Sequence, residues 1–177
     1  LGFLSLNKAL EKISKVIDTV EKLEKVAGHL YNWYDIKTLK VKMPFVISSV
    51  DSGNFVACLL VCREFTFKNK DIKLTERIDK LIQKTNFKML YTDKNVFSVS
   101  YDTKEAKLSE YNYNKFASES RLLGYVAIAL RQVPIKHWLS LDKTLTKYKN
   151  RKGLVSWSGT SFEYFMPFLF MKNYKNT

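Results

Sequence analysis

The sequence predicts a mainly α fold with short β-hairpins, and three observations indicate this. Between residues 4 and 26 the apolar residues recur at steps of three and four, which is the spacing of an amphipathic helix. The apolar runs at 53–65 and 114–131 favour two helices that are buried along one or more faces. Short apolar segments flank the polar residues 92–95, a pattern that is typical of a hairpin.

Cap and turn residues set the boundaries of the first elements. Gly28 is expected to end the first helix as a C-terminal cap, because glycine tolerates the backbone conformation needed there. The segments that follow are expected to be extended, with a turn at 35–38. Either Ser49 or Asp51 then caps the helix over 53–65, since both side chains accept hydrogen bonds from a helix N-terminus.

The second half of the chain contains shorter elements. Residues 74–82 favour a short helix, and Pro134 ends the helix over 114–131. The segment 142–153 is polar and lysine-rich, so we expect an exposed loop or a short surface helix. A turn at 157–159 leads into a last helix that starts near Thr160 and carries an aromatic and aliphatic stripe formed by Phe162, Phe165 and Leu169.

Composition limits the classes of function. A chain of 177 residues allows one domain with its own core, and it contains no apolar run long enough to span a membrane. The net charge is +13, but only five of the 30 basic residues are arginine, the residue that nucleic-acid readers favour. We therefore prefer a lysine-rich solvated surface. A basic protein that binds nucleic acid or an anionic membrane surface is the alternative, and its binding would weaken steeply with salt.

Cysteine and histidine usage indicates no metal site. Cys58 and Cys62 lie four apart in an apolar run, so we expect reduced, buried core cysteines rather than a zinc site. His29 and His137 have no second histidine at ligand spacing.

The mixture of side chains at 28–35 and 49–54 is typical of a sugar-binding site. Aromatic faces cover the C–H groups of a pyranose, while carboxylates and amides bind its hydroxyls. Trp33 and Tyr34 are the stacking candidates here, with core packing as the alternative. The hydroxyl-binding candidates in these two segments are Asp35, Asp51, Ser52 and Asn54, and for Asp51 a role as helix cap is at least as well supported.

Glu119 is the best catalytic candidate. Small neighbours surround it at the start of the predicted helix over 114–131, which leaves room for a substrate, although a glutamate there also favours the helix dipole. Arg121 could hold a carboxylate of the cleft in its ionised form. Trp157 is a third stacking candidate, and Glu163 could accept a sugar hydroxyl beside it. A capping box with Thr160 is the slightly favoured alternative for Glu163.

Five blocks in order resemble the central soluble, glycoamylase-like region of cyclic β-1,2-glucan synthases. They are GHLYNWYD at 28–35, SVDSGN at 49–54, FSVSY at 97–101, ASESR at 117–121 and LVSWSGTSFEYFMP at 154–167. The resemblance implies a partial (α/α)6 toroid and gives Glu119 the role of one of two catalytic carboxylates, as base or nucleophile. The family's second acid lies in a later Gly-Ile-Ser-Glu-Ser block that these 177 residues do not contain.

The resemblance implies that residues 1–177 are one fragment of a larger carbohydrate-active domain, truncated at both ends. Its substrate would be β-1,2-glucan or a related oligosaccharide, by transglycosylation with ring closure or by hydrolysis, without a cofactor. The partners would be the remainder of the parent synthase and, through exposed helix faces, a second copy. The parent would be a membrane-associated bacterial enzyme with this part on its cytoplasmic side. A glucan-binding module without activity is the alternative, since half of the catalytic pair is expected to be absent.

Overall fold

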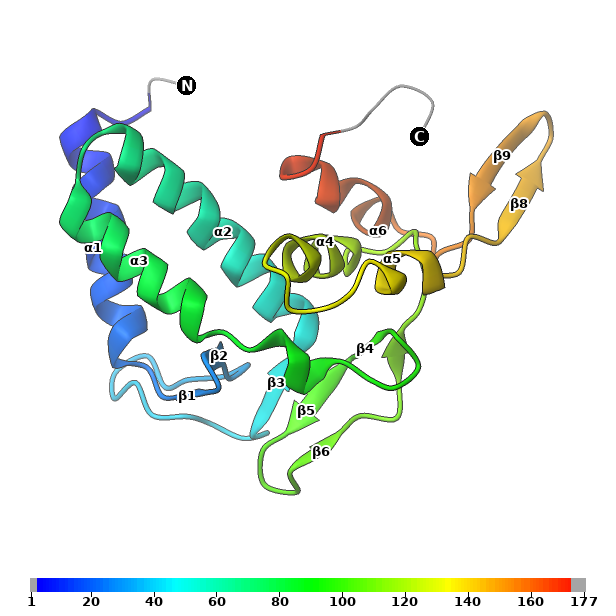
Figure 1. The fold of residues 1–177 in the computed structure, drawn as a ribbon, viewed down its shortest axis with the longest axis horizontal. Helices are drawn as coiled ribbons and strands as arrows, with labels where there is room; N and C mark the ends of the chain where they lie inside the picture. The colour runs from blue at the N-terminus through cyan, green and yellow to red at the C-terminus, as the bar shows by residue number, and fades with distance from the viewer. Residues whose placement is uncertain (1–2, 173–177) are drawn as a thin grey trace.

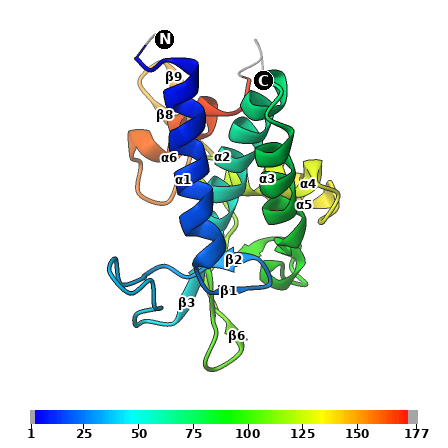
Figure 2. The same ribbon diagram turned by 90° about the vertical axis from the view of Figure 1, so that its left-hand side faces the viewer.

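The computed structural model describes residues 3–172, and its architecture is mainly α with short strands, as predicted. Three long helices lie side by side in one half of the molecule (Figures 1 and 2), α1 (Leu6–Lys22), α2 (Ser49–Lys68) and α3 (Ile72–Lys84). The other half holds the shorter helices α4 (Arg121–Ala129), α5 (Lys136–Ser140) and α6 (Ser161–Phe165), together with the 3-10 turns η1 (Phe87–Leu90) and η2 (Met166–Leu169).

Ion pairs link the three long helices to one another, and a continuous apolar core lies beneath these pairs. Arg77 of α3 contacts Asp18 of α1 at 2.6 Å and Glu21 at 2.7 Å. Arg63 of α2 contacts Asp79 of α3 at 3.1 Å. Under these pairs, the core runs from α1 to α4 through fully or almost fully buried side chains, among them Ile17, Val56, Ile78, Phe87, Phe97, Leu122 and Leu123.

Two glycines allow α4 to lie very close to its neighbours. A Cβ atom on Gly53 of α2 would stand 2.6 Å from Cα of Leu123 in α4. A Cβ atom on Gly124 would stand 2.4 Å from Nε2 of His137 in α5. Real Cβ atoms do not come this close to other heavy atoms, so both contacts require glycine. The start of α4 is therefore held tightly between α2 and α5.

The strands form four small antiparallel sheets. Strand β3 (Val46–Ser48) pairs with β5 (Ser100–Asp102), which also pairs with β6 (Lys107–Leu108). Strand β4 (Phe97–Ser98) pairs with β7 (Asn112–Tyr113), so that Tyr113 lies opposite Phe97. Two hairpins complete the set, β1 (Lys25–Val26) with β2 (His29–Leu30), and β8 (Leu145–Tyr148) with β9 (Arg151–Leu154). The second hairpin projects from the body of the molecule (Figure 1).

The helix predicted over 114–131 starts later than expected, because the chain before it is extended. Residue Lys115 forms a parallel bridge with Asp142, and its Nζ lies 2.5 Å from Oδ2 of Asp142. The backbone N–H of Phe116 donates to the carbonyl of Asp142 at 2.9 Å. These bonds hold 114–116 outside the helix, so Glu119 lies in the turn that precedes α4 rather than inside a helix.

Four other expectations are wrong in detail. Gly28 does not cap α1, which ends with Leu23 as C-cap; with φ at +84° it turns the β1–β2 hairpin instead. The segment 142–153 is neither a loop nor a helix, because most of it forms the β8–β9 hairpin. Cys58 is exposed and Cys62 is only partly buried, so neither is a core cysteine. Helix α2 also extends further at both ends than predicted, with Ser48 as its N-cap.

Candidate functional site

A cavity of about 510 Å³ lies where strand β7, the turn before α4 and the loop before α6 meet. Its wall contains four aromatic side chains and one acidic side chain that is not used in a cap, Glu119. The lining residues are Val99, Tyr111, Asn112, Tyr113, Glu119, Trp157, Ser158, Thr160, Phe162 and Glu163. The predicted site residues Glu119, Trp157 and Glu163 are thus brought together.

The start of α2 is fixed close to this cavity. The backbone N–H of Ser49 donates to the carbonyl of Val99, a lining residue, at 3.1 Å. Ser48 caps the helix by accepting from the backbone N–H of Asp51 at 3.3 Å. The side chain of Asp51 is therefore not the cap, and its carboxylate accepts no hydrogen bond from any residue between 3 and 172. An exposed carboxylate in the first turn of α2 is left available near the cavity.

Neighbouring serines orient the Glu119 carboxylate. The hydroxyl of Ser118 lies 3.3 Å from Oε2 of Glu119 and donates to it. The Ser118 oxygen in turn accepts from the backbone N–H of Ser120 at 3.2 Å and from its hydroxyl at 2.9 Å. Among the described residues no lysine or arginine forms an ion pair with Glu119. The carboxylate is thus positioned without being neutralised by a cation.

Tyr113 connects the two carboxylates electrostatically. Burial, followed by the negative charges of Glu119 and Asp51, raises the pKa of the Tyr113 phenol to about 12. Tyr113 and Glu119 line the same cavity, and the charge of Asp51, which lies outside the lining, has the smallest of the three effects on the phenol. The phenol keeps its proton at any physiological pH, and it remains a hydrogen-bond donor.

Glu163 has a structural role in the loop before α6. Its carboxylate oxygens accept from the backbone N–H groups of Trp157 at 2.9 Å, Ser158 at 3.2 Å and Thr160 at 3.0 Å. Burial raises the pKa of Glu163, but hydrogen bonds from Ser158 and Thr160 outweigh it and lower the pKa to about 2. The predicted capping box with Thr160 is confirmed. With its oxygens engaged in this way, the carboxylate has little capacity left for a sugar hydroxyl.

Seven predicted contact residues, Asp51 among them, do not line the cavity, and three of these lie in the segment 33–35. Trp33 is 60% exposed on the loop between β2 and β3. The hydroxyl of Tyr34 accepts from the backbone N–H of Tyr31 at 2.9 Å and donates to the carbonyl of Glu24 at 2.6 Å. Oδ1 of Asp35 accepts from the backbone N–H groups that close the predicted turn, which lowers the pKa of Asp35. Tyr34 and Asp35 therefore shape their own loop.

Two residues of α2 also differ from expectation. Ser52 is buried, and its hydroxyl donates to the carbonyl of Ser48 at 2.8 Å, so the helix itself uses this group. Asn54 has a buried Oδ1 that no described residue partners. Neither residue lines the cavity.

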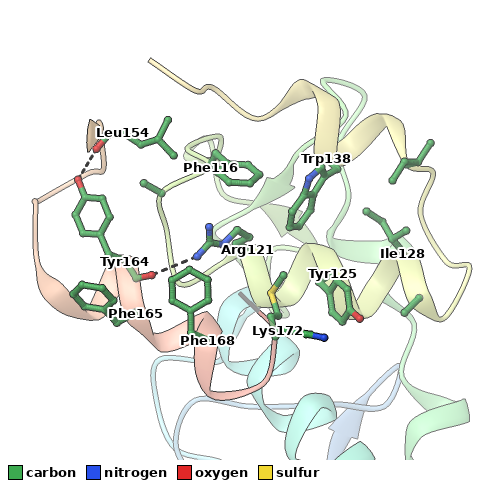
Figure 3. A pocket seen from close by; sticks show the side chains of 14 residues that line it. Phe116, Arg121, Tyr125, Ile128, Trp138, Leu154, Tyr164, Phe165, Phe168 and Lys172 are labelled. Carbon is green, nitrogen blue, oxygen red and sulfur yellow. Dashed lines mark hydrogen bonds between the residues drawn. The ribbon is translucent and has the colours of Figure 1, made fainter. Parts of the chain in front are cut away.

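Arg121 faces a different cavity, of about 740 Å³, between α4, α5 and the α6–η2 segment (Figure 3). Its guanidinium lies over the rings of Phe116 at 5.1 Å and Phe168 at 5.0 Å, and it donates to the carbonyl of Tyr164 at 3.4 Å. Nε of Arg121 is buried and has no hydrogen-bond partner among the described residues, and burial lowers the pKa of the group. Besides Arg121 and Lys172, the lining is apolar or aromatic. We call this second cavity the apolar groove.

The sequence interpretation missed seven of the ten residues that line the first cavity, among them Tyr111, Asn112, Tyr113 and Phe162. A signal for three of them was present. Residues 111–113 read Tyr-Asn-Tyr, the same mixture of aromatic and amide side chains that singled out residues 31–34. The Oδ1 atom of Asn112 is buried and has no hydrogen-bond partner in the described chain.

Two features are absent from residues 3–172. No group of three or more histidine, cysteine, aspartate or glutamate side chains is arranged to hold a metal ion. No helix in the same range is long and apolar enough to cross a membrane.

Comparison with known proteins supports the resemblance seen in the sequence. Over 100 residues, or 56% of its length, the chain is 36% identical to the cyclic β-(1,2)-glucan synthase NdvB of Rhizobium meliloti, and it covers 4% of that protein. No family model matches the chain.

Two solved structures share the fold. An endo-β-1,2-glucanase from Chitinophaga pinensis, in complex with sophorotriose and glucose, matches with a TM-score of 0.77 at 20% identity, over 90% of this chain and 41% of the glucanase. A glucoamylase-like protein from Bacteroides fragilis matches with a TM-score of 0.77 at 16% identity, over 92% of this chain and 43% of that protein. The chain thus spans less than half the length of each protein it matches.

Proposed function

We propose that the chain is part of an enzyme domain that acts on β-1,2-linked glucan, and that the cavity containing Glu119 binds the sugar. The observation that carries the proposal is the position of one oriented, unpaired carboxylate among four aromatic side chains. Aromatic faces and hydroxyl-binding carboxylates are the groups that a pyranose requires. The synthase that is similar in sequence and the glucanase that is similar in structure are both named for β-1,2-glucan, and we therefore propose the β-1,2 linkage for the substrate.

Within the cavity, each group has a distinct task. Trp157 is 56% exposed and offers its ring for stacking. Glu119 acts as base or nucleophile at the anomeric carbon, because glycoside chemistry needs one carboxyl group for attack or activation and a second to protonate the leaving oxygen. The second acid would come from the remainder of the parent protein. Without that acid, the chain alone is expected to bind glucan and to leave its length unchanged.

The larger domain would be an (α/α)6 toroid, of which residues 1–177 form one part. Two features support this. The solved relatives of the same fold extend beyond the matched region by more than their matched length. The apolar groove exposes aromatic side chains such as Phe165, which a further helix would cover. We propose that the apolar groove contacts the rest of a parent synthase. That synthase would be a membrane-associated enzyme with this part of the chain on its cytoplasmic side.

Incubation of the chain with β-1,2-glucan tests this function, with β-1,3-glucan as the matched control. Binding and product length are measured together. Selective binding of β-1,2-glucan supports the proposal, and a change in chain length would show that both acids are present. Binding without a change in length fits either a piece of an enzyme or a glucan-binding module. Binding to DNA or anionic lipid, with none to either glucan, would contradict the proposal.

A further inference from the structure

The hydroxyl of Tyr113 has no hydrogen-bond partner within residues 3–172, although the residue lies in the wall of the cavity. A cavity-lining hydroxyl without a protein partner is free to bind a ligand. Glu119, whose carboxylate forms no ion pair with a described residue, lines the same cavity. A hydroxyl donor and a carboxylate acceptor are thus available in one cavity.

We infer that Tyr113 contacts the substrate: its hydroxyl, in the same cavity as Glu119, binds a hydroxyl of one glucose unit and holds that unit against the Glu119 carboxylate. The inference rests on the proposed function and extends it to a residue that sequence patterns did not single out. It also gives a role to Asp51, whose carboxylate would accept a hydrogen bond from a second hydroxyl of the same glucose unit.

The backbone holds these three side chains in place from three elements. Tyr113 pairs with Phe97 across β4 and β7, which fixes its strand. The N–H of Ser49 binds the carbonyl of Val99, which fixes the start of α2 two residues before Asp51. The close approach of Gly53 to Leu123 fixes the first turns of α2 and α4 against each other. Preorganised groups of this kind bind a ligand without losing further conformational entropy.

The electrostatics fit a sugar hydroxyl better than an anion. The two carboxylates that act on the phenol repel an anionic ligand, while each can accept a hydrogen bond from a sugar hydroxyl. The phenol remains protonated and therefore supplies a donor for a sugar oxygen. Glu163 cannot replace Asp51 in this arrangement, because its oxygens already accept from Trp157, Ser158 and Thr160.

The experiment is an NMR titration of the chain with sophorotriose, a β-1,2-linked glucose trimer. Wild type is compared with Tyr113→Phe and with Tyr148→Phe, a matched control whose phenol is exposed on β8. Loss of one hydrogen bond is expected to weaken binding by Tyr113→Phe about tenfold. Tyr148→Phe is expected to bind as wild type does. Thermal unfolding of each variant checks that the fold is kept.

A second readout tests the charges that act on Tyr113. In a spectroscopic titration of tyrosine, the combined substitution Asp51→Asn and Glu119→Gln is expected to lower the pKa of Tyr113 from about 12, while burial keeps it above its ordinary value. An unchanged pKa would overturn the electrostatic link of Tyr113 to the two carboxylates.

The binding outcomes distinguish the two proposals. If wild type binds sophorotriose and Tyr113→Phe binds it equally well, the role of Tyr113 is overturned and the proposed function stands. If wild type does not bind sophorotriose or longer β-1,2-glucan, the proposed function fails and the role of Tyr113 fails with it.

Discussion

Gly53 in α2 lies directly against the backbone of Leu123 in α4, so that a Cβ atom on Gly53 would stand 2.6 Å from Cα of Leu123. This contact is one turn or less from the start of each helix. Asp51 precedes Gly53 by two residues, and Glu119 precedes Leu123 by four. The close approach of two helices therefore determines how near two carboxylates come to the same tyrosine.

Replacing Gly53 with alanine is expected to destabilise the protein, although alanine favours a helix by about 1 kcal/mol over glycine. The added methyl group must displace backbone atoms of α4, at a net cost of about 2–3 kcal/mol. A fall in melting temperature of about 5–10 °C is the expected result in a calorimetric scan. Gly153→Ala is the matched control, because a Cβ atom there meets no atom within 4 Å. Equal stability of the two variants would contradict the tight contact.

Replacing Glu163 with glutamine is expected to cost about 2 kcal/mol at pH 7, because an amide cannot accept all the N–H and hydroxyl donors of the loop. The pKa of Glu163 in the folded protein is about 2, below its ordinary value of 4.5. The unfolded chain therefore binds the proton more readily, and stability falls as the pH drops from about 4.5 toward 2. Chemical unfolding across this range should show the unfolding free energies of wild type and Glu163→Gln converging near pH 2. The control Glu76→Gln, on the exposed face of α3, should have the unfolding free energy of wild type at every pH.

Replacing Glu119 with glutamine is expected to weaken sophorotriose binding about tenfold, since a hydrogen bond to a carboxylate is stronger than one to an amide. Folding is expected to be unchanged, because Glu119 forms no ion pair with any residue between 3 and 172 and lies in a turn outside α4. Calorimetric titration measures both effects, with Glu76→Gln again as the control. Undiminished binding by Glu119→Gln would remove this residue from the sugar site.

Exposure of the apolar groove is expected to produce binding of the fluorescent dye ANS and concentration-dependent self-association. Phe165→Ser should reduce both, because Phe165 lines the groove and is 64% exposed. Phe3→Ser removes an equally apolar and even more exposed ring that lies outside the groove, and it should reduce neither. Sedimentation velocity at several concentrations measures the association. Equal effects of the two substitutions would show that the groove is not the contact surface.

The sequence predicted the elements whose burial is periodic. Helices α1 and α3 each bury one face, and their apolar residues recur at helical spacing. The β8–β9 hairpin could not be predicted in this way, because almost all of its residues are exposed and no alternation of burial exists. The late start of α4 depends on Lys115 and Asp142, which are distant in the sequence.

The site was predicted in part for a related reason. Glu119 and Trp157 were identified, and the structure brings them into one cavity. Local composition drew equal attention to Tyr34 and Asp35, but it cannot show that backbone groups already use their polar atoms. Tyr113 has the same kind of neighbours in sequence, and only the pairing of β4 with β7 places it beside Glu119.

The three tryptophans provide the most direct test, because each marks a different region. Trp157 lines the cavity with Glu119, Trp138 lines the apolar groove, and Trp33 lies on the β2–β3 loop. In an NMR titration with sophorotriose, the indole N–H resonance of Trp157 is expected to shift and saturate while the other two stay in place. A saturable shift of Trp33 or Trp138 with none at Trp157, or no shift of any indole, would contradict the assignment of the sugar site.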